Sequence, residues 1–175
     1  NCQAERKARA LAIVSAHPFV APAWLRNAHA QTMWSPFFRR PSRTPRRVER
    51  IETPDGDFLD LHVVDGHRGK PAVLLLHGLE GSAGSKYILG MNDKLRALGW
   101  TAIAMEFRGC GRDMNRARRL YHSGETTDLA FVATRLASLY PRLYLAGFSL
   151  GGNVLAKWLG ESARALPANR CGAAA

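Results

Sequence analysis

One short stretch of the chain has the residue types and the spacing that nucleophilic catalysis requires. Gly147, Ser149 and Gly151 form the pattern G-x-S-x-G. The apolar run of residues 143–146 before it predicts a buried strand, and apolar residues at helical spacing follow over residues 153–160. Between a strand and a helix, this pattern is typical of a serine held on a strained turn at the positive end of the helix. We therefore predict that Ser149 is a nucleophile; the alternative is a tight turn that happens to contain a serine.

A serine nucleophile also needs N–H donors that hold the negative oxygen of the reaction intermediate. One donor is expected to be the backbone amide of Leu150, directly after the serine. The other is expected from the loop of residues 77–81 (HGLEG), whose glycines let the backbone turn its amides toward the site, and Leu79 is the predicted donor. His77 and Gly78 would line the site. An ordinary glycine-containing turn is the alternative for this loop.

The general base is harder to place than the donors. In this type of site the chain order is serine, then carboxylate, then histidine. No histidine follows Ser149, however, and Glu161 is the only acid there. Upstream, His77 is expected to be structural, and His122, on a loop at the same edge of the sheet, is expected to shape the site rather than to act as the base. We therefore expect the acid and the histidine of the triad to be missing from this chain.

The elements around these residues follow an alternating pattern. Two runs of alternating apolar and polar residues surround the turn signal Asp55-Gly56 and predict a β-hairpin. Continuously apolar runs then alternate with helical patterns, which is typical of an α/β protein whose mostly parallel sheet has helices on both faces. The hairpin strands are expected at residues 48–53 and 58–64, the three central strands at 72–76, 100–105 and 143–146, and the helices between them at 86–98 and 125–139.

We predict two parts of the chain, an N-terminal arm over residues 1–45 and a partial α/β domain over residues 46–175. In the arm, a helix is expected from Ala23 to Trp34, and Pro36 is expected to stop it. The aromatic residues of the arm could pack on the core or help to line an apolar substrate channel. They are Phe19, Trp24, Trp34, Phe37 and Phe38.

Composition narrows the classes of function. The chain has 175 residues, of which 46% are apolar, and a net charge of +11. Six arginines fall within residues 39–50. Such a run could meet nucleic acid or an anionic membrane, but it lacks interleaved aromatics and any nucleic-acid-binding motif, so we expect a solvated linker and no nucleic-acid partner. No cofactor is expected, because neither a phosphate-binding loop nor a dinucleotide fingerprint is present.

Three widely spaced cysteines, Cys2, Cys110 and Cys171, build neither a disulfide framework nor a metal site. We expect Cys110 to be an ordinary loop thiol rather than a nucleophile. The one candidate secretion signal is the short apolar run of residues 10–16 after three basic residues, and it contains Ser15. We therefore expect a reducing, cytoplasmic location.

Five stretches together resemble the α/β-hydrolase superfamily and, within it, the YheT-like group of esterases. They are residues 24–32 (WLRNAHAQT), 77–82 (HGLEGS), 107–111 (FRGCG), 121–126 (YHSGET) and 147–153 (GFSLGGN). The resemblance implies an α/β-hydrolase fold and the hydrolysis of carboxylic esters, with short- to medium-chain acyl esters or acylglycerols as substrates, and it carries Ser149 over as the nucleophile. It also allows contact with lipid or a membrane surface and leaves the oligomeric state open.

Such hydrolases continue well beyond the nucleophile helix, so the chain looks like the N-terminal portion of a member, truncated after that helix. A further buried strand would be expected just after residues 173–175. Two alternatives remain: a non-catalytic, truncated or degenerate hydrolase-fold chain, and an anion- or nucleic-acid-binding protein that uses the arginine run.

Overall fold

The computed structural model describes residues 20–38, 42, 44–162 and 171–174. Contacts between Cα atoms divide the chain into two compact units, Asn1–Arg39 and Arg40–Ala175, which we describe separately. The boundary predicted after residue 45 stays a prediction. None of the helices in the described ranges combines the length and the apolar character that a membrane crossing requires.

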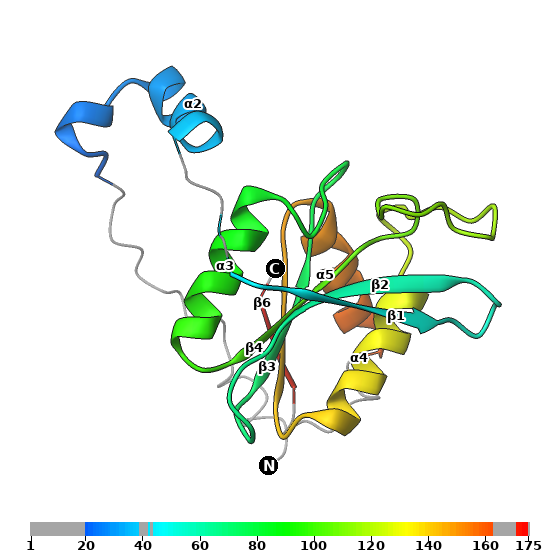
Figure 1. Ribbon diagram of the computed structural model, residues 1–175. Helices are drawn as coiled ribbons and strands as arrows, with labels where there is room; N and C mark the ends of the chain where they lie inside the picture. The colour runs from blue at the N-terminus through cyan, green and yellow to red at the C-terminus, as the bar shows by residue number, and fades with distance from the viewer. Residues whose placement is uncertain (1–19, 39–41, 43, 163–170, 175) are drawn as a thin grey trace, which may run out of the picture. The chain divides into compact units, whose positions relative to one another are not determined.

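The larger unit is built on one six-stranded sheet (Figure 1). Its strands lie in the order β1-β2-β4-β3-β5-β6. Strands β4, β3, β5 and β6 run parallel to one another. Strands β1 and β2 form an antiparallel hairpin, and β2 joins the sheet by pairing antiparallel with β4. The bounds are β1 Arg47–Glu52, β2 Phe58–Val64, β3 Ala72–Leu76, β4 Thr101–Met105, β5 Leu143–Gly147 and β6 Cys171–Ala174. The predicted hairpin and mostly parallel sheet are confirmed.

Three helices cover the two faces of the sheet. Helix α3 (Lys86–Ala97) lies on one face, and α4 (Thr127–Leu139) and α5 (Leu150–Ser162) lie on the other (Figure 1). Two hydrophobic cores result, one including Ile88 and Leu95 of α3 and the other including Leu129 of α4 and Trp158 of α5. The strands between them are apolar on both sides because both sides are covered: all five residues of β3 and of β4 are buried.

The structure corrects the expectation for the last strand. The sequence predicted three central strands and a fourth only after residues 173–175, but β6 already begins at Cys171 and pairs in parallel with β5. The sequence of β6 is Cys-Gly-Ala-Ala, which lacks the β-branched and aromatic residues that usually indicate a strand. The segment forms a strand because the edge of β5 supplies backbone hydrogen-bond partners, which the strand propensity of its own residues does not take into account.

The second strand of the hairpin also differs from its pattern. Alternating apolar and polar residues are typical of a strand with one solvated face, yet in β2 only His62 is partly exposed. Asp60 lies at 6% exposure because Arg50 of β1 donates to it at 2.7 and 2.8 Å. A buried charge is tolerated where a partner is hydrogen-bonded to it, so a polar residue in an alternating run does not always point to water.

The smaller unit contains a 3₁₀ helix, η1 (Ala23–Leu25), and α2 (Ala28–Phe38). The carboxamide of Asn27 accepts from the amides of His29 and Ala30, which starts α2 as a separate helix. The expectation that Pro36 stops the helix is wrong, because α2 continues to Phe38. Trp34 and Phe38, one turn apart, stack at 4.4 Å between ring centroids and stabilise this last turn, in which the proline lacks a backbone N–H.

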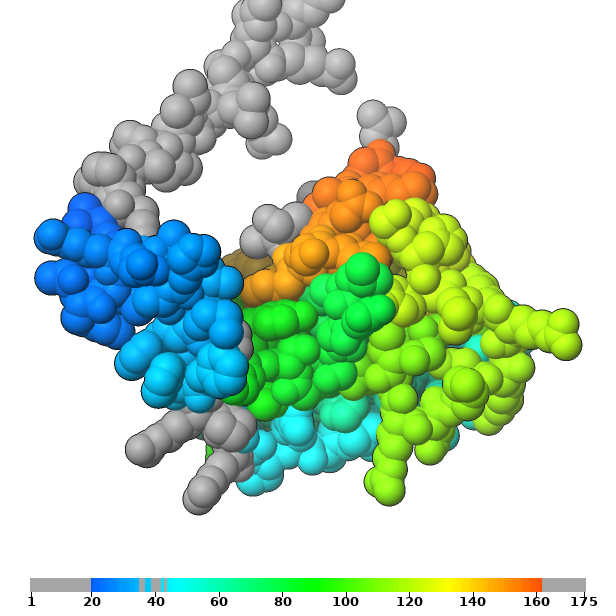
Figure 2. Space-filling model, turned by 90° about the horizontal axis from the view of Figure 1, so that it is seen from above, coloured from blue at the N-terminus to red at the C-terminus, as the bar shows by residue number. Residues whose placement is uncertain are grey.

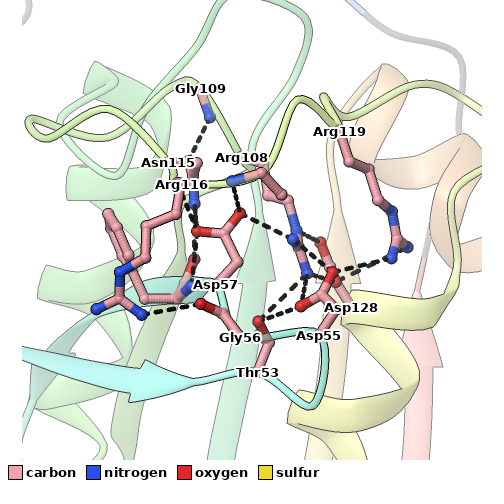
Figure 3. A network of polar contacts seen from close by, with 12 residues as sticks. Thr53, Asp55, Gly56, Asp57, Arg108, Gly109, Asn115, Arg116, Arg119 and Asp128 are labelled. Carbon is pink, nitrogen blue, oxygen red and sulfur yellow. Dashed lines mark hydrogen bonds and ion pairs between the residues drawn. The ribbon is translucent and has the colours of Figure 1, made fainter.

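A buried arginine joins three distant segments of the larger unit (Figure 3). Arg108, which follows β4, is 2% exposed and bonds Asp55 and Asp57 of the hairpin turn and Asp128 of α4. The guanidinium of Arg108 holds the pKa of Asp55 well below its usual range. Asn115, further along the same loop, also donates to Asp57 at 3.1 Å. This network fixes the long loop after β4, which runs on toward the candidate site.

Candidate active site

The candidate site lies at the edge of the sheet where β3, β4 and β5 end. The chain leaves β3 through α3 to β4 on one side, and later passes through α4 to β5 on the other side of β3. Where connections diverge in this way, the carboxyl ends of the strands leave a crevice in which α/β proteins bind ligands. Figure 2 looks onto this edge: the loop after β3 (green), the loop after β4 (yellow-green) and the start of α5 (orange) adjoin.

The turn between β5 and α5 has the geometry of a nucleophile elbow. Ser149 has φ +52°, a left-handed conformation that costs a non-glycine residue about 1–2 kcal/mol. The flanking glycines are required by close backbone contacts. A methyl group on Gly147 would lie 2.4 Å from the carbonyl oxygen of Gly151, and one on Gly151 would lie 2.5 Å from that of His77. Sequence and packing therefore force the sharp turn that lifts the Ser149 side chain, which is exposed.

The first amides of α5 lie directly beside this serine. The N–H of Asn153 donates to the Ser149 carbonyl at 3.0 Å, and the N–H of Gly151 donates to Phe148 at 2.9 Å. Among the residues that the structure describes, the amide of Leu150 has no acceptor. It is thus open to an external acceptor, as the predicted oxyanion role requires.

The loop of residues 77–81 lies next to Ser149. A methyl group on Gly78 would lie 3.3 Å from Cβ of Ser149. The next residue, Leu79, has a side chain that is 65% exposed, and within the described ranges its amide donates to no acceptor. The structure therefore brings together Ser149, Gly78 and the two amides of Leu79 and Leu150. Their roles in a reaction stay predictions.

His77 is bound through both ring nitrogens. It is 1% exposed, and its Nδ1 lies 2.8 Å from the carbonyl oxygen of Gly78, so this nitrogen must carry the proton. Its Nε2 accepts from the amide of Phe107 at 3.2 Å and lies 3.3 Å from the Glu106 carboxylate. A ring held in this way is oriented to support the loop and has no free lone pair for a substrate.

His122 is exposed, and it lies on the loop that leads into α4. Its Nδ1 accepts from the amide of Gly124 at 3.1 Å, and the neighbouring carbonyl of Ser123 accepts from the Asn153 side chain at 2.9 Å. These contacts place the loop beside α5. Since Nδ1 is occupied, the neutral ring carries its proton on Nε2, and His122 could accept a proton only by giving up the Gly124 bond. The geometry thus disfavours it as a base.

Two alternative chemistries find little support in the described residues. Burial raises the pKa of the Cys110 thiol, which disfavours the thiolate that a nucleophile needs. Arg47 bonds Asp65 and Glu49, while Arg50 bonds Asp60 and Asp113. Both arginines lie in β1, so the expected solvated linker ends before Arg47, and their charges are partnered within the protein.

Sequence reasoning missed two tyrosines at this site. Tyr87, in the first turn of α3, accepts from the amide of Gly78 at 2.9 Å, and Tyr121 accepts from the amide of Glu80 at 3.0 Å. Tyr87 is one of several apolar residues in a helical pattern, so nothing local in the sequence distinguishes it. Tyr121 stands in the YHSGET stretch quoted above, but that stretch does not say which backbone amide the hydroxyl contacts.

The order of the strands and the helices on both faces of the sheet define the α/β-hydrolase fold, and the comparison with protein families agrees. Residues 71–171, more than half of the chain, match the family described as the alpha/beta hydrolase fold. The chain belongs to this family.

Individual relatives carry esterase and phospholipase names. The chain is 38% identical over 158 residues to YheT of Escherichia coli (strain K12), which has an esterase name, and 31% identical over 148 residues to phospholipase ABHD3 of Mus musculus. These matches cover 87% and 79% of this chain but only 46% and 36% of the relatives. Among solved structures, the Pyrococcus furiosus esterase Pf2001 has a TM-score of 0.57 and 25% identity, over 69% of this chain and 48% of its own.

Proposed function

We propose that this chain carries the nucleophile and the oxyanion donors of a serine hydrolase that acts on carboxylic esters. One observation carries the proposal: an exposed serine with φ +52° lies beside a loop whose Leu79 amide has no acceptor among the described residues. Strain at one exposed polar residue, next to unused backbone donors, is the arrangement that nucleophilic acyl transfer requires.

In the proposed reaction, Oγ of Ser149 attacks the carbonyl carbon of the ester while its proton passes to a histidine. The amides of Leu79 and Leu150 hold the oxyanion that forms. When the intermediate collapses, the alcohol leaves with the proton from the histidine, and an acyl-serine remains. Water then attacks this ester under the same base, releasing the carboxylic acid and restoring the serine.

The base and the acid of the triad are proposed to lie outside these 175 residues. Within the described part of the chain, His77 is bound at both nitrogens, and the Nδ1 of His122 is occupied. The chain spans about half the length of YheT and about a third of mouse ABHD3, so the relatives have room for further strands that deliver these groups.

The proposed substrates are esters with an apolar acyl chain. Leu79 presents an apolar side chain at 65% exposure next to the serine, and Phe148 and Leu150 on either side of Ser149 are partly exposed. The phospholipase name of ABHD3 and the esterase name of YheT fit the same class. Short- to medium-chain acyl esters and acylglycerols are the first compounds to test.

An esterase assay with a series of p-nitrophenyl acyl esters tests the proposal. In the longer protein that carries this chain, Ser149→Ala should abolish turnover, whereas Ser138→Ala, a matched change on the exposed face of α4, should leave it unchanged. The 175-residue chain alone should show no turnover that depends on Ser149. Turnover by the chain alone that Ser149→Ala abolishes would mean that an upstream base such as His122 serves after all.

The alternative is a non-catalytic hydrolase-fold chain. It is favoured by one observation: at the sheet edge beside Ser149, His77 is bound at both ring nitrogens and the Nδ1 of His122 is occupied. Turnover of the longer protein that depends on Ser149 would exclude it, and turnover by neither form would establish it against our proposal. Turnover that is unchanged in Ser149→Ala would overturn the proposed role of Ser149.

A further inference from the structure

The amides of the loop at residues 77–81 are not equally available. The N–H of Gly78, which is buried, donates to the hydroxyl of Tyr87 at 2.9 Å. The N–H of Glu80 donates to the hydroxyl of Tyr121 at 3.0 Å, and that of Gly81 donates to the carbonyl of Gly78 at 3.0 Å. Of the amides of residues 78–81, only that of Leu79 has no acceptor among the described residues. The unbound amide of Leu79 therefore lies between two amides, those of Gly78 and Glu80, that are already hydrogen-bonded.

Tyr87 touches both halves of the site. Its hydroxyl lies against the loop so closely that a methyl group on Gly81 would be 2.9 Å from it. Its ring lies 4.9 Å, centroid to centroid, from the ring of Phe148, the residue before Ser149. Because Tyr87 belongs to the first turn of α3, it ties the loop and the elbow to a packed helix rather than to another loop.

Tyr121 holds the other end of the loop from the segment after β4. Its ring stacks on Phe107 at 5.3 Å and 11°, and Phe107 in turn packs edge-on against His77 at 4.9 Å. Its partner Glu80 has φ +52° and is, with Ser149, one of two non-glycine residues at positive φ in the described chain. A residue in this region stays there only when its surroundings hold it, and the bond to Tyr121 is such a constraint.

We propose that Tyr87 and Tyr121 are positioning residues of the oxyanion loop. Each hydroxyl binds the amide of one residue next to Leu79. Between these two bound amides, the Leu79 amide remains free and keeps a fixed direction toward the reacting oxygen. Preorganised donors are effective because they need not reorient during the reaction, and a misplacement of about 1 Å at a reacting group can cost about 100-fold in rate. This inference rests on the proposed function.

Amide hydrogen exchange tests the bonding without requiring turnover. In the wild-type chain, the amides of Gly78 and Glu80 should exchange more slowly than that of Leu79. Tyr87→Phe should speed the exchange of Gly78 alone, and Tyr121→Phe that of Glu80 alone, each by about two- to tenfold, as the loss of one neutral hydrogen bond predicts. Tyr144→Phe, a change on β5, is the matched control, because the Tyr144 hydroxyl accepts from Arg142 rather than from the loop. Equal exchange at all three amides in the wild type would overturn the proposal.

Steady-state kinetics of the longer protein test the consequence. Each Tyr→Phe change should lower kcat about 10- to 100-fold while KM stays within about twofold, since the loop acts on the transition state. Tyr144→Phe should leave both constants unchanged. A purely structural role would instead lower the unfolding midpoint at constant kcat, and that result would overturn the proposal.

The Ser149→Ala variant separates the two levels of inference. If turnover does not depend on Ser149, the proposed function fails. If turnover depends on Ser149 but is unchanged by both Tyr87→Phe and Tyr121→Phe, the serine hydrolase stands and the positioning role fails.

Discussion

Ser149 holds its backbone at φ +52°, and that conformation has a measurable cost in folding stability. Ser149→Gly should therefore unfold at a higher urea concentration than Ser149→Ala, and its free energy of unfolding should be larger by about 0.5–1 kcal/mol. The reason is that glycine adopts this φ without the clash of a Cβ atom. Urea denaturation of the two variants measures the difference directly, and neither variant keeps the hydroxyl.

The matched control is a residue of α5, the helix that follows Ser149. Ala156 is an exposed residue of α5, so Ala156→Gly should destabilise by about 0.5–1 kcal/mol. If Ser149→Gly also proved less stable than Ser149→Ala, the serine would not be strained, and the inference from strain to function would lose its basis.

At the residue scale, a pattern in the sequence could predict the strained serine but not its supports. The glycines of G-x-S-x-G indicate a turn in which the backbone of another residue comes too close to leave room for a side chain. Such close backbone contacts are present at Gly147 and Gly151. Tyr87 and Tyr121 lie 9 and 41 residues from the amides that they bind. No local period links such residues, so only the packing of α3 and of the loop after β4 reveals them.

Among the elements, the hairpin turn, the loop after β4 and helix α4 are joined through Arg108. Arg108→Met should destabilise the protein by about 3–5 kcal/mol, because it leaves the carboxylates of Asp55, Asp57 and Asp128 without their buried cation. Chemical denaturation of the variant, at pH 7 and constant salt, measures this loss.

Arg116→Met is the control for the same change of side chain. The pair of Arg116 with Glu52 is solvated, with side-chain exposures of 55% and 64%, so its loss should cost no more than about 1 kcal/mol. Equal losses in the two variants would show that burial of Arg108 does not make its network stronger than a surface ion pair.

The same network makes the free energy of unfolding depend on pH in the acid range. Burial alone would raise the pKa of Asp57, but hydrogen bonds from the Arg116 amide, the Asn115 side chain and the Phe58 amide lower it to about 2. A carboxyl whose pKa is lower in the folded than in the unfolded chain stabilises the fold above the unfolded value of 3.8, and this contribution is lost as the pH falls toward 2. The wild type should therefore lose stability steadily between about pH 4 and pH 2.

Urea midpoints at several pH values check this expectation. Asp57→Asn should be less stable than the wild type at pH 7 and should lose less on acidification. Asp113→Asn, a change at an exposed carboxylate, should keep the slope of the wild type. Parallel curves for the wild type and Asp57→Asn would contradict the role of Asp57.

At the scale of elements, the sequence predicted the features that follow from the spacing of apolar residues. It failed where a contact with a residue far along the chain, or a side-chain contact outside that spacing, determines the structure. The apolar runs of β3 and β4 indicate strands covered on both faces, and both are buried throughout. By contrast, the burial of Asp60 depends on Arg50, and β6 depends on the open edge of β5. A helix that passes Pro36 depends on the stacking of Trp34 on Phe38, which the proline rule does not consider.

For the whole molecule, the two units predict independent folding. Among the described residues, every buried hydrophobic side chain lies between Ile51 and Trp158, all in the larger unit. A chain that starts at Arg40 should therefore keep its unfolding free energy within about 0.5 kcal/mol of the full chain, the usual effect of changes away from a core. Urea denaturation and a two-dimensional NMR spectrum of the shortened chain measure this.

A second deletion locates the boundary between the units. Ser42 and Thr44 donate from their hydroxyls to Asp93 on α3, at 2.5 and 2.6 Å, so a chain that starts at Arg46 lacks two bonds that a chain starting at Arg40 retains. Each should contribute about 0.5–1.5 kcal/mol, and the shorter chain should be less stable by about that amount or twice it. Equal stability of the two deletions would place the boundary after residue 45, as the sequence predicted. A large loss already on removal of residues 1–39 would show that this segment packs on the hydrolase unit, and its aromatic residues would then be part of the core.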